Sequence, residues 1–332
     1  VNNFQDNCAL NYQMAEIGTN IDQAAALLQS GKLVAIPTET VYGLAGNALD
    51  ESAILDIFKV KKRPKFDPLI AHTDSLEKIK GIVTHIPEKA LMLAEAFWPG
   101  PLTILLNKKP HIPDILTSGL SDVAVRIPRH PLTHALLSQL DFPLAAPSAN
   151  PFGYISPTSA QHVQDQLGAH IPYILDGGTC AVGIESTIIG FNEHEQPIVY
   201  RLGGKKIDDI EQVVGKVKLR INHSSDPIAP GMLKSHYAPS KRLIIGNLSE
   251  LVPRFHKRNF GVISFHQSFD GLTADRQIIL SKTRNLDEAA RHLFGALRTM
   301  DQKDVEFIIT EKFPDMGLGQ AINDRLKRAA TR

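Results

Sequence analysis

Short apolar runs, each bounded by Gly, Pro, Asp or Asn, recur through the first part of the chain and restrict it to a fold built on a sheet. These runs have the length of buried strands and are too short for helices, and they occupy residues 33–36, 102–106, 123–127, 173–175, 187–189 and 198–202. Residues at helical spacing lie between them at 21–28 and 90–97, the second stretch opening at Pro87 and stopping before Pro99. This alternation predicts a mixed α/β domain.

A polar stretch rich in Gly and Pro, residues 203–240, interrupts this pattern and is predicted to be a connection with one short strand near 217–221. A regular alternation follows, with strands expected at 242–245, 261–265, 278–280 and 307–310 and helices at 248–255 and after Asn285. Such alternation favours a small parallel three-layer domain. Because 332 residues exceed the roughly 250 to 300 that share one core, we expect domains at 14–202 and 241–332, joined by the linker 203–240.

Composition excludes several classes of protein. The 36 Lys+Arg and 35 Asp+Glu leave a formal charge of +1, so no overall field attracts nucleic acid or an anionic membrane. No apolar run reaches the ~18 residues of a membrane span and the first residues do not resemble a leader, so we expect a cytoplasmic protein. Cys8 and Cys180 are too few for a four-cysteine zinc site and are expected to be reduced thiols. The sequence also lacks the standard motifs of NTPases, dinucleotide enzymes, zinc hydrolases and serine hydrolases.

Two polar clusters interrupt the first apolar segments. Residues 36–44 place three hydroxyl side chains and a carboxylate directly after a predicted strand, which suits either a small polar ligand or a capped turn. Residues 59–65 hold five cations, followed by Pro68, and these charges could either clamp phosphate oxygens or form a solvated face.

Three further clusters lie later in the first domain. Ser148 and Asn150 stand among small residues that permit close approach of a ligand, and Ser156 follows them. In residues 183–189, a polar triplet is followed directly by a predicted buried strand. Arg201 stands alone in an apolar run and therefore needs a partner anion, either a protein carboxylate or a ligand phosphate.

Together these clusters resemble the Sua5/YrdC family over nearly the whole chain. Residues 37–44 are similar to the family's strand-loop signature, Lys61 and Arg63 to its K-x-R element, and Ser148 with Asn150 to its S-x-N element. The order and spacing also match at 98–103, 125–128 and 185–187, and in the linker at 230–232 and 236–239. The resemblance implies a YrdC-like twisted mixed sheet with helices, followed by a smaller Rossmann-like three-layer α/β domain.

The resemblance further implies a nucleotidyltransferase that forms L-threonylcarbamoyladenylate and pyrophosphate from L-threonine, bicarbonate or CO2, and ATP. Magnesium would accompany the ATP, and the protein itself would hold no metal. The product would pass to a downstream tRNA threonylcarbamoyl-transferase that makes N6-threonylcarbamoyladenosine, with the linker folded over the active site. No membrane partner is expected, and direct binding of tRNA is not expected either.

The site residues that this resemblance implies form two groups, with Lys61 and Arg63 in the catalytic role. The threonine group is Thr40, His72, Arg126, Ala146 and Ser186. The nucleotide group is Lys61, Arg63, Ser148, Asn150, Ser156, Arg201 and Tyr237. His72 either accepts a proton or only positions threonine.

Two carboxylates depart from the family pattern, Asp67 where Asn is expected and Asp122 where Thr is expected. Either one would repel a triphosphate unless a cation bridges them.

Three other functions compete with this hypothesis. The cations at 59–65 suit an RNA-binding module without catalysis, although only Phe66 supplies an adjacent aromatic ring. A carbamoyltransferase of the hydrogenase-maturation type shares the YrdC domain but needs zinc-finger cysteines that two cysteines cannot provide. The third is an amino-acid-binding protein without catalysis.

Overall fold

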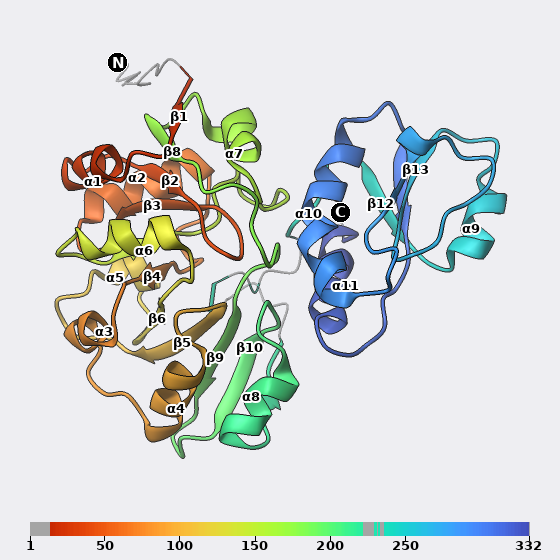
Figure 1. Cartoon of the computed structure of the whole chain (residues 1–332). Coiled ribbons are helices and arrows are strands. Elements are labelled where there is room, and N and C mark those ends of the chain that lie inside the picture. Colours follow the sequence, from red (N-terminus) through yellow and green to blue (C-terminus); the bar gives the residue numbers. More distant parts are fainter. Residues whose placement is uncertain (1–13, 222–228, 231, 233–235, 332) are drawn as a thin grey trace, which may run out of the picture.

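The predicted strands pair into two separate sheets, each with helices packed on it (Figure 1). The computed structural model describes residues 14–221, 229–230, 232 and 236–331. The first sheet has 11 strands and the second has 4, so a larger first domain is followed by a smaller second domain. The predicted combination of a mixed α/β domain with a smaller α/β domain is confirmed.

The strands of the first sheet lie side by side in the order β1-β8-β2-β3-β7-β4-β6-β5-β9-β10-β11. Parallel pairs such as β4 with β6 alternate with antiparallel pairs such as β2 with β3, so the sheet is mixed. The strand bounds are β1 Glu16–Gly18, β2 Val34–Ile36, β3 Gly43–Asn47, β4 Ile70–His72, β5 Leu102–Asn107, β6 Asp122–Arg126, β7 Leu144–Ala145, β8 Tyr173–Leu175, β9 Thr187–Phe191, β10 Pro197–Arg201 and β11 Lys218–Leu219.

Helices cover this sheet, and several begin at side-chain caps that the sequence supplies. Asn20 caps the first helix and Asp50 caps the second, each by accepting a hydrogen bond from a backbone N–H of the first turn. The helix bounds are α1 Ile21–Gln29, α2 Glu51–Lys61, α3 Leu76–Ile82, α4 Glu88–Phe97, α5 Asp114–Thr117, α6 Pro131–Ser138, α7 Ala160–Leu167 and α8 Ile207–Val214.

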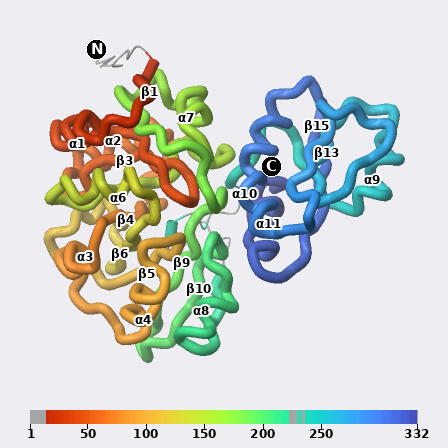
Figure 2. Tube along the Cα trace, viewed as in Figure 1, coloured from red at the N-terminus to blue at the C-terminus, as the bar shows by residue number. Residues whose placement is uncertain are grey.

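The second domain is a wholly parallel sheet in the order β12-β15-β13-β14. Figures 1 and 2 show α10 and α11 between this sheet and the first domain, with α9 on the opposite side, which gives three layers. The bounds are β12 Arg242–Ile245, α9 Leu248–Arg254, β13 Phe260–Ser264, the short helix η1 Ala274–Arg276, β14 Gln277–Ile279, α10 Leu286–Gln302, β15 Phe307–Thr310 and α11 Gly319–Ala329.

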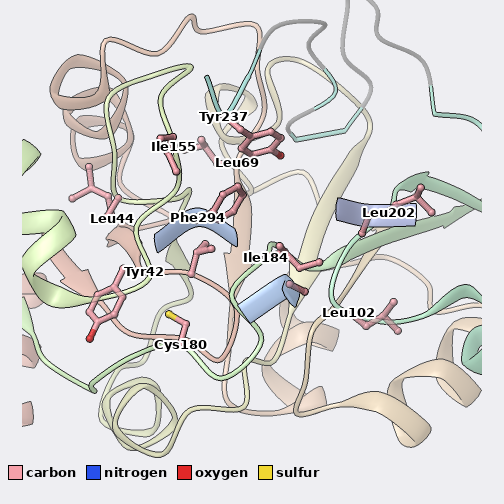
Figure 3. Packing of buried hydrophobic residues seen from close by; sticks show 14 of the residues in the cluster. Tyr42, Leu44, Leu69, Leu102, Ile155, Cys180, Ile184, Leu202, Tyr237 and Phe294 are labelled. Carbon is pink, nitrogen blue, oxygen red and sulfur yellow. The ribbon is translucent and has the colours of Figure 1, made fainter. Parts of the chain in front are cut away.

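One buried cluster runs from the first domain into the second. Phe294 of α10 stacks on Tyr237 of the linker, with ring centroids 5.6 Å apart. Figure 3 shows these two rings beside Leu69, Ile155 and Ile184 of the first domain. The two domains and the linker therefore share apolar packing, which fixes the second domain against the first.

The predicted linker, 203–240, begins with elements that pack on the first domain. Ile210 and Val214 of α8 are buried in the main core, and β11 pairs in parallel with β10. The sequence analysis anticipated the short strand and missed the helix. The predicted features at residues 1–13, 222–228, 231 and 233–235, Cys8 among them, lie outside the described residues.

Candidate functional site

A cavity opens where β2, β4, β6 and β10 end, where β9 begins and where the linker crosses these strands. Within its bounds about 580 Å³ is not filled by atoms, a volume that includes space open to solvent. The side chains that line it come from both polar clusters at strand ends and from the linker: Thr38, Thr40, Arg63, His72, Arg126, Ser148, Glu185, Ser186, Arg201, His236 and Tyr237, with the backbone near Ala146.

The turn after β2 presents a hydroxyl acceptor to this cavity. Thr38 donates its hydroxyl hydrogen to the carbonyl of Val41 at 2.6 Å and accepts the backbone N–H groups of Thr40 and Val41. The Thr38 and Thr40 hydroxyl oxygens lie 2.8 Å apart. Because the hydrogen of Thr38 is already engaged, Thr40 donates to Thr38 and keeps its lone pairs for a ligand.

Arg126, at the end of β6, pairs with Glu39 beside this turn. Its Nη2 lies 2.7 Å from Oε1 of Glu39, and both side chains are buried. The other carboxylate oxygen of Glu39 accepts the backbone N–H of Arg129 at 2.9 Å. Glu39 therefore fixes Arg126 while leaving part of the guanidinium at the cavity wall.

His72, at the end of β4, stays uncharged in this environment. Burial, followed by the charge of Arg126, lowers the pKa of His72 to about 3. Its Nδ1 lies 3.1 Å from the carbonyl oxygen of Ile70. A group with this pKa is a poor proton acceptor near pH 7, so the geometry favours the positioning role over the general-base role.

The cationic run at residues 59–65 divides into two sets. Helix α2 ends at Lys61 because Lys62 adopts a left-handed conformation with φ of +52°. Lys61 and Arg63 then point inward and are buried, whereas Lys59, Lys62 and Lys65 are exposed. The solvated-face interpretation therefore fits the three exposed lysines, and only Lys61 and Arg63 remain candidates for the phosphate clamp.

Arg63 lines the cavity and forms an ion pair with Asp67. The guanidinium lies 2.9 Å from Oδ2 of Asp67 and also donates to the carbonyls of Asp67 and Pro68. Arg63 is thus the cation that offsets the unexpected carboxylate at position 67. The second departure, Asp122, accepts a hydrogen bond from Asn107 at the start of β6 and does not line the cavity.

Lys61 lies behind the cavity wall. Its ammonium donates to the carbonyls of Ser148 and Asn150, so it supports the S-x-N element from within. Burial, and then the charge of Arg63, hold the pKa of Lys61 well below its usual value. The Asn150 amide donates to the carbonyls of Pro151 and Tyr154, which shapes the next loop, whereas Ser148 lines the cavity.

Arg201 closes the opposite wall together with Ser186. The guanidinium donates to the carbonyl and the hydroxyl of Ser186, each at 3.0 Å, and to the carbonyl of Pro230 at 3.2 Å. Burial lowers the pKa of Arg201 to about 10, although Tyr237 and Glu185 act to raise it. No carboxylate among the described residues forms an ion pair with Arg201. Arg201 therefore presents a desolvated positive charge to the cavity.

Glu185 connects the cavity to the second domain. Its Oε1 accepts the hydroxyl of Ser156 at 2.5 Å, and its Oε2 lies 3.0 Å from Nε of Arg325 on α11. Arg325 also donates to the carbonyl of Leu202 at 2.6 Å. Ser156 consequently lies behind the cavity wall, bonded to Glu185.

The linker forms the roof of the cavity. Pro230, His236 and Tyr237 line it together with first-domain residues. The Tyr237 ring is packed between Phe294 and the guanidinium of Arg328, whose carbon lies 4.7 Å from the ring centroid. The second domain thus holds the linker in place from outside.

Some of the predicted site residues line the cavity, and others lie behind its wall. All five residues of the predicted threonine group line the cavity, as do Arg63, Ser148, Arg201 and Tyr237 of the nucleotide group. Lys61, Asn150 and Ser156 lie directly behind the wall. The sequence analysis did not single out Glu39, Glu185 or His236 as site residues, although each stands inside a motif that it quoted.

The described residues lack two features, a metal-binding cluster and a membrane-spanning helix. No group of three or more His, Cys, Asp or Glu side chains in this part of the chain could hold a metal ion. No helix in the described ranges has both the length and the apolar character needed to cross a membrane.

Comparison with known proteins gives two family matches in chain order. A model named for Sua5, YciO and YrdC and described as "Telomere recombination" matches residues 26–203. A model described as "Threonylcarbamoyl-AMP synthase, C-terminal domain" matches residues 206–331. The boundary between the two matches falls at the start of the predicted linker.

Individual relatives match over nearly their whole length. The threonylcarbamoyl-AMP synthase of Pyrococcus abyssi is 42% identical over 322 residues, which cover 92% of this chain and 93% of the relative. The threonylcarbamoyl-AMP synthase of Bacillus subtilis is 40% identical over 329 residues, 95% of each chain. Among solved structures, that of P. abyssi Sua5 complexed with L-threonine superimposes with a TM-score of 0.89 at 40% identity, covering 96% of this chain and 98% of that one.

Proposed function

The chain belongs to the two-domain Sua5 family of threonylcarbamoyl-AMP synthases, and from this premise we propose how its cavity joins L-threonine, bicarbonate and ATP. The chain is an enzyme of this family, and the RNA-binding alternative without catalysis is disfavoured. The observation that carries the proposal is the convergence of Arg63, Arg126 and Arg201 on one closed cavity. Three buried guanidinium groups in one cavity suit substrates that carry carboxylate and phosphate groups.

We assign the Thr40 side of the cavity to L-threonine, the ligand in the P. abyssi Sua5 structure. Arg126 would bind the amino-acid carboxylate, and Thr40, with its free lone pairs, would accept a hydrogen bond from the amine or the hydroxyl group. His72, Ser186 and the backbone at Ala146 would complete this group. A neutral His72 leaves the threonine carboxylate to Arg126.

The Arg63 and Arg201 side would take ATP. Both guanidinium groups are buried, and Ser148, which also lines the cavity, forms a backbone bridge with Gly43 at the start of β3. Lys61 would act through the carbonyls of Ser148 and Asn150 that it holds. Tyr237 would close over the nucleotide from the linker.

The reaction then follows from placing the two substrates in one water-poor space. The threonine amine attacks CO2, supplied from bicarbonate, and loses a proton, which gives a carbamate. A carbamate oxygen attacks the α-phosphorus of ATP, the bond to the bridging oxygen breaks, and pyrophosphate leaves with its electron pair. Arg63 and Arg201 would stabilise the charge that builds on the phosphoryl oxygens, and alignment within the cavity would lower the barrier further.

The side chains around the cavity suit magnesium that arrives on the nucleotide. The carboxylates of Glu39, Asp67 and Glu185 each contact an arginine, so the described residues offer no ready-made metal cage. When bound, Mg²⁺ would neutralise phosphate charge, as it commonly does through substrate oxygens and water. We further propose a cytoplasmic location and transfer of the adenylate to a tRNA threonylcarbamoyl-transferase, because the product is an activated carbamoyl group.

The test is to follow pyrophosphate release with ATP, bicarbonate and a panel of amino acids. We expect release to require both L-threonine and bicarbonate, and the adenylate to appear in equal amount. Valine, which has the shape of threonine without the hydroxyl, is the matched control. Formation of ADP and phosphate, or release that ignores threonine, would show that the proposal is wrong.

A further inference from the structure

A second pocket lies between the two domains, and we call it the interdomain crevice. Its first-domain wall includes Trp98, Arg129 and Lys205, and its second-domain wall includes Asp287 and Arg291 of α10. It neighbours the catalytic cavity without sharing lining residues with it. The shared wall is held by Glu39, whose carbonyl accepts the N–H of Val182 at 2.7 Å and whose carboxylate accepts the N–H of Arg129.

The charges that line this crevice do not balance. Four cations and two acids face it, the cations being Arg129, Lys205, Lys206 and Arg291. Lys205 lies 2.8 Å from Asp209, and Lys206 lies 3.0 Å from Asp287, so both acids are already paired. Arg129 and Arg291 form no ion pair with any acid in the described parts of the chain. Two like charges therefore face one crevice from opposite domains.

The position of Arg291 is set by a close backbone approach. Gly183, with φ of +79°, lies so near α10 that a Cβ added to it would stand 2.5 Å from the Cα of Arg291. Nε of Arg291 donates to the carbonyl of Ala181 at 2.8 Å. This bond fixes the plane of the guanidinium and leaves its two Nη groups for an acceptor in the crevice.

The remaining lining also suits an anion. Helix α8 begins at Ile207 beside the crevice, and no side chain caps its first turn. Its free N–H groups add a partial positive charge at the same place as Lys205 and Lys206, partly offset by Asp208 and Asp209 of that turn. Trp98 and Pro99 give the crevice an apolar wall next to these groups.

We propose that the interdomain crevice binds an oligophosphate, free or carried by a nucleotide, between Arg129 of the first domain and Arg291 of the second. A chain of two or three phosphates offers enough oxygens to satisfy both guanidinium groups at once. Because the ligand would contact both domains, it would hold the second domain against the first, and with it the packing of α10 on the linker. This site goes beyond the proposed synthase reaction and requires none of its substrates.

The chain itself supplies a reporter, since Trp98 is its single tryptophan and lines the crevice. Inorganic tripolyphosphate is titrated into the full-length protein at low salt while the fluorescence of Trp98 is recorded. We expect a saturable change, with a dissociation constant raised at least ~10-fold by Arg129→Gln or by Arg291→Gln, because each removes a charged hydrogen-bond donor. Arg254→Gln, on exposed α9, is the matched control and should bind like the wild type.

The catalytic cavity would itself attract phosphate, so the titration is repeated in Arg63→Ala and in Arg201→Met. Retention of the signal in these variants supports the crevice, whether or not the synthase reaction exists. A flat titration of the wild type overturns the proposal, as does loss of the signal in the cavity variants together with its retention in the crevice variants. Repeating the titration with ATP distinguishes the source, since tighter binding than tripolyphosphate shows that the base adds contacts on the Trp98 wall.

Discussion

The cavity wall and the domain interface each contain a buried arginine, and the two are compensated differently. Arg201 on the wall donates only to the Ser186 side chain and to two carbonyls, and burial lowers its pKa to about 10. Arg325 at the interface lies 3.0 Å from Glu185 and 2.9 Å from Asp324. Although burial acts to lower the pKa of Arg325, Tyr237 and these two carboxylates hold it above its usual value.

This difference separates two uses of a buried charge. A guanidinium with carboxylate partners inside the protein is already satisfied and serves to join elements. A guanidinium that faces a cavity without one is stabilised when an anionic substrate arrives. Position in the fold, rather than burial, therefore distinguishes a structural arginine from a substrate-binding one.

The largest effect is expected from Arg325→Met, which leaves Glu185 buried without its cation, whereas Asp324 keeps Arg328 at 3.6 Å. Breaking such a pair costs about 3–5 kcal/mol of unfolding free energy. Urea unfolding at pH 7 measures it. Arg258→Met, which breaks the exposed pair with Glu306, is the control and should cost under about 1 kcal/mol. Equal losses in the two variants would mean that the interface arginine is not structural.

The next largest effect is expected from Arg201→Met, and it concerns the reaction rate rather than the unfolding free energy. Pyrophosphate release should fall at least ~10²-fold, because a charge that stabilises the transition state is removed. The unfolding free energy should change by under about 1 kcal/mol, since no carboxylate loses its partner. Arg63→Ala should show the same loss of rate but also a loss of stability, because it breaks the buried ion pair between Arg63 and Asp67.

The third effect is on the pH dependence of the unfolding free energy and comes from His72, the uncharged histidine of the cavity. Below pH 6.5 the unfolded chain protonates His72, whereas the folded chain keeps it neutral down to about 3, so acid lowers stability through this residue. His72→Gln should therefore reduce the loss of unfolding free energy between pH 7 and pH 5, by on the order of 1–2 kcal/mol. Unfolding curves at the two pH values measure it, and an identical pH dependence in both proteins would contradict the assigned neutral state.

The smallest effect is expected at Tyr237, where the interface acts on the cavity through the linker. Tyr237→Ala removes the ring that α10 and α11 hold over the cavity, and turnover should fall ~10-fold through poorer exclusion of water. Tyr237→Phe keeps the ring packing, loses only the 3.5 Å contact with Arg328, and should stay near the wild-type rate. If both variants turn over equally fast, the linker is only a tether.

The elements predicted most accurately from the sequence are those that pack against apolar residues. The strands expected at 173–175, 242–245 and 307–310 are observed at these bounds, because each is a short, largely apolar run with clear ends. Helix α11 was not predicted, since its charged residues resemble a solvated face, yet Arg325 and Arg328 are buried there. Burial of such residues depends on partners far away in the chain, which periodicity cannot reveal.

The candidate site shows the same limit. The hydroxyl turn and the K-x-R and S-x-N elements could be located because they interrupt apolar strands. The sequence could not show that Lys61 would turn toward the carbonyls of Ser148 and Asn150 while Arg63 turned toward the cavity, since the left-handed Lys62 between them decides both directions.

The ion pair between Glu185 and Arg325 joins two residues that the ribosome makes at well-separated times. Its two residues are separated by 140 positions. At the ribosomal rate of about 5–20 residues per second, Glu185 is made roughly 7–28 s before its partner. The roof residues Pro230, His236 and Tyr237 are made during that interval, but Phe294 and Arg328, which pack on the Tyr237 ring, come later. A nascent chain therefore acquires a roof that the second domain holds in place only after that domain has emerged and docked.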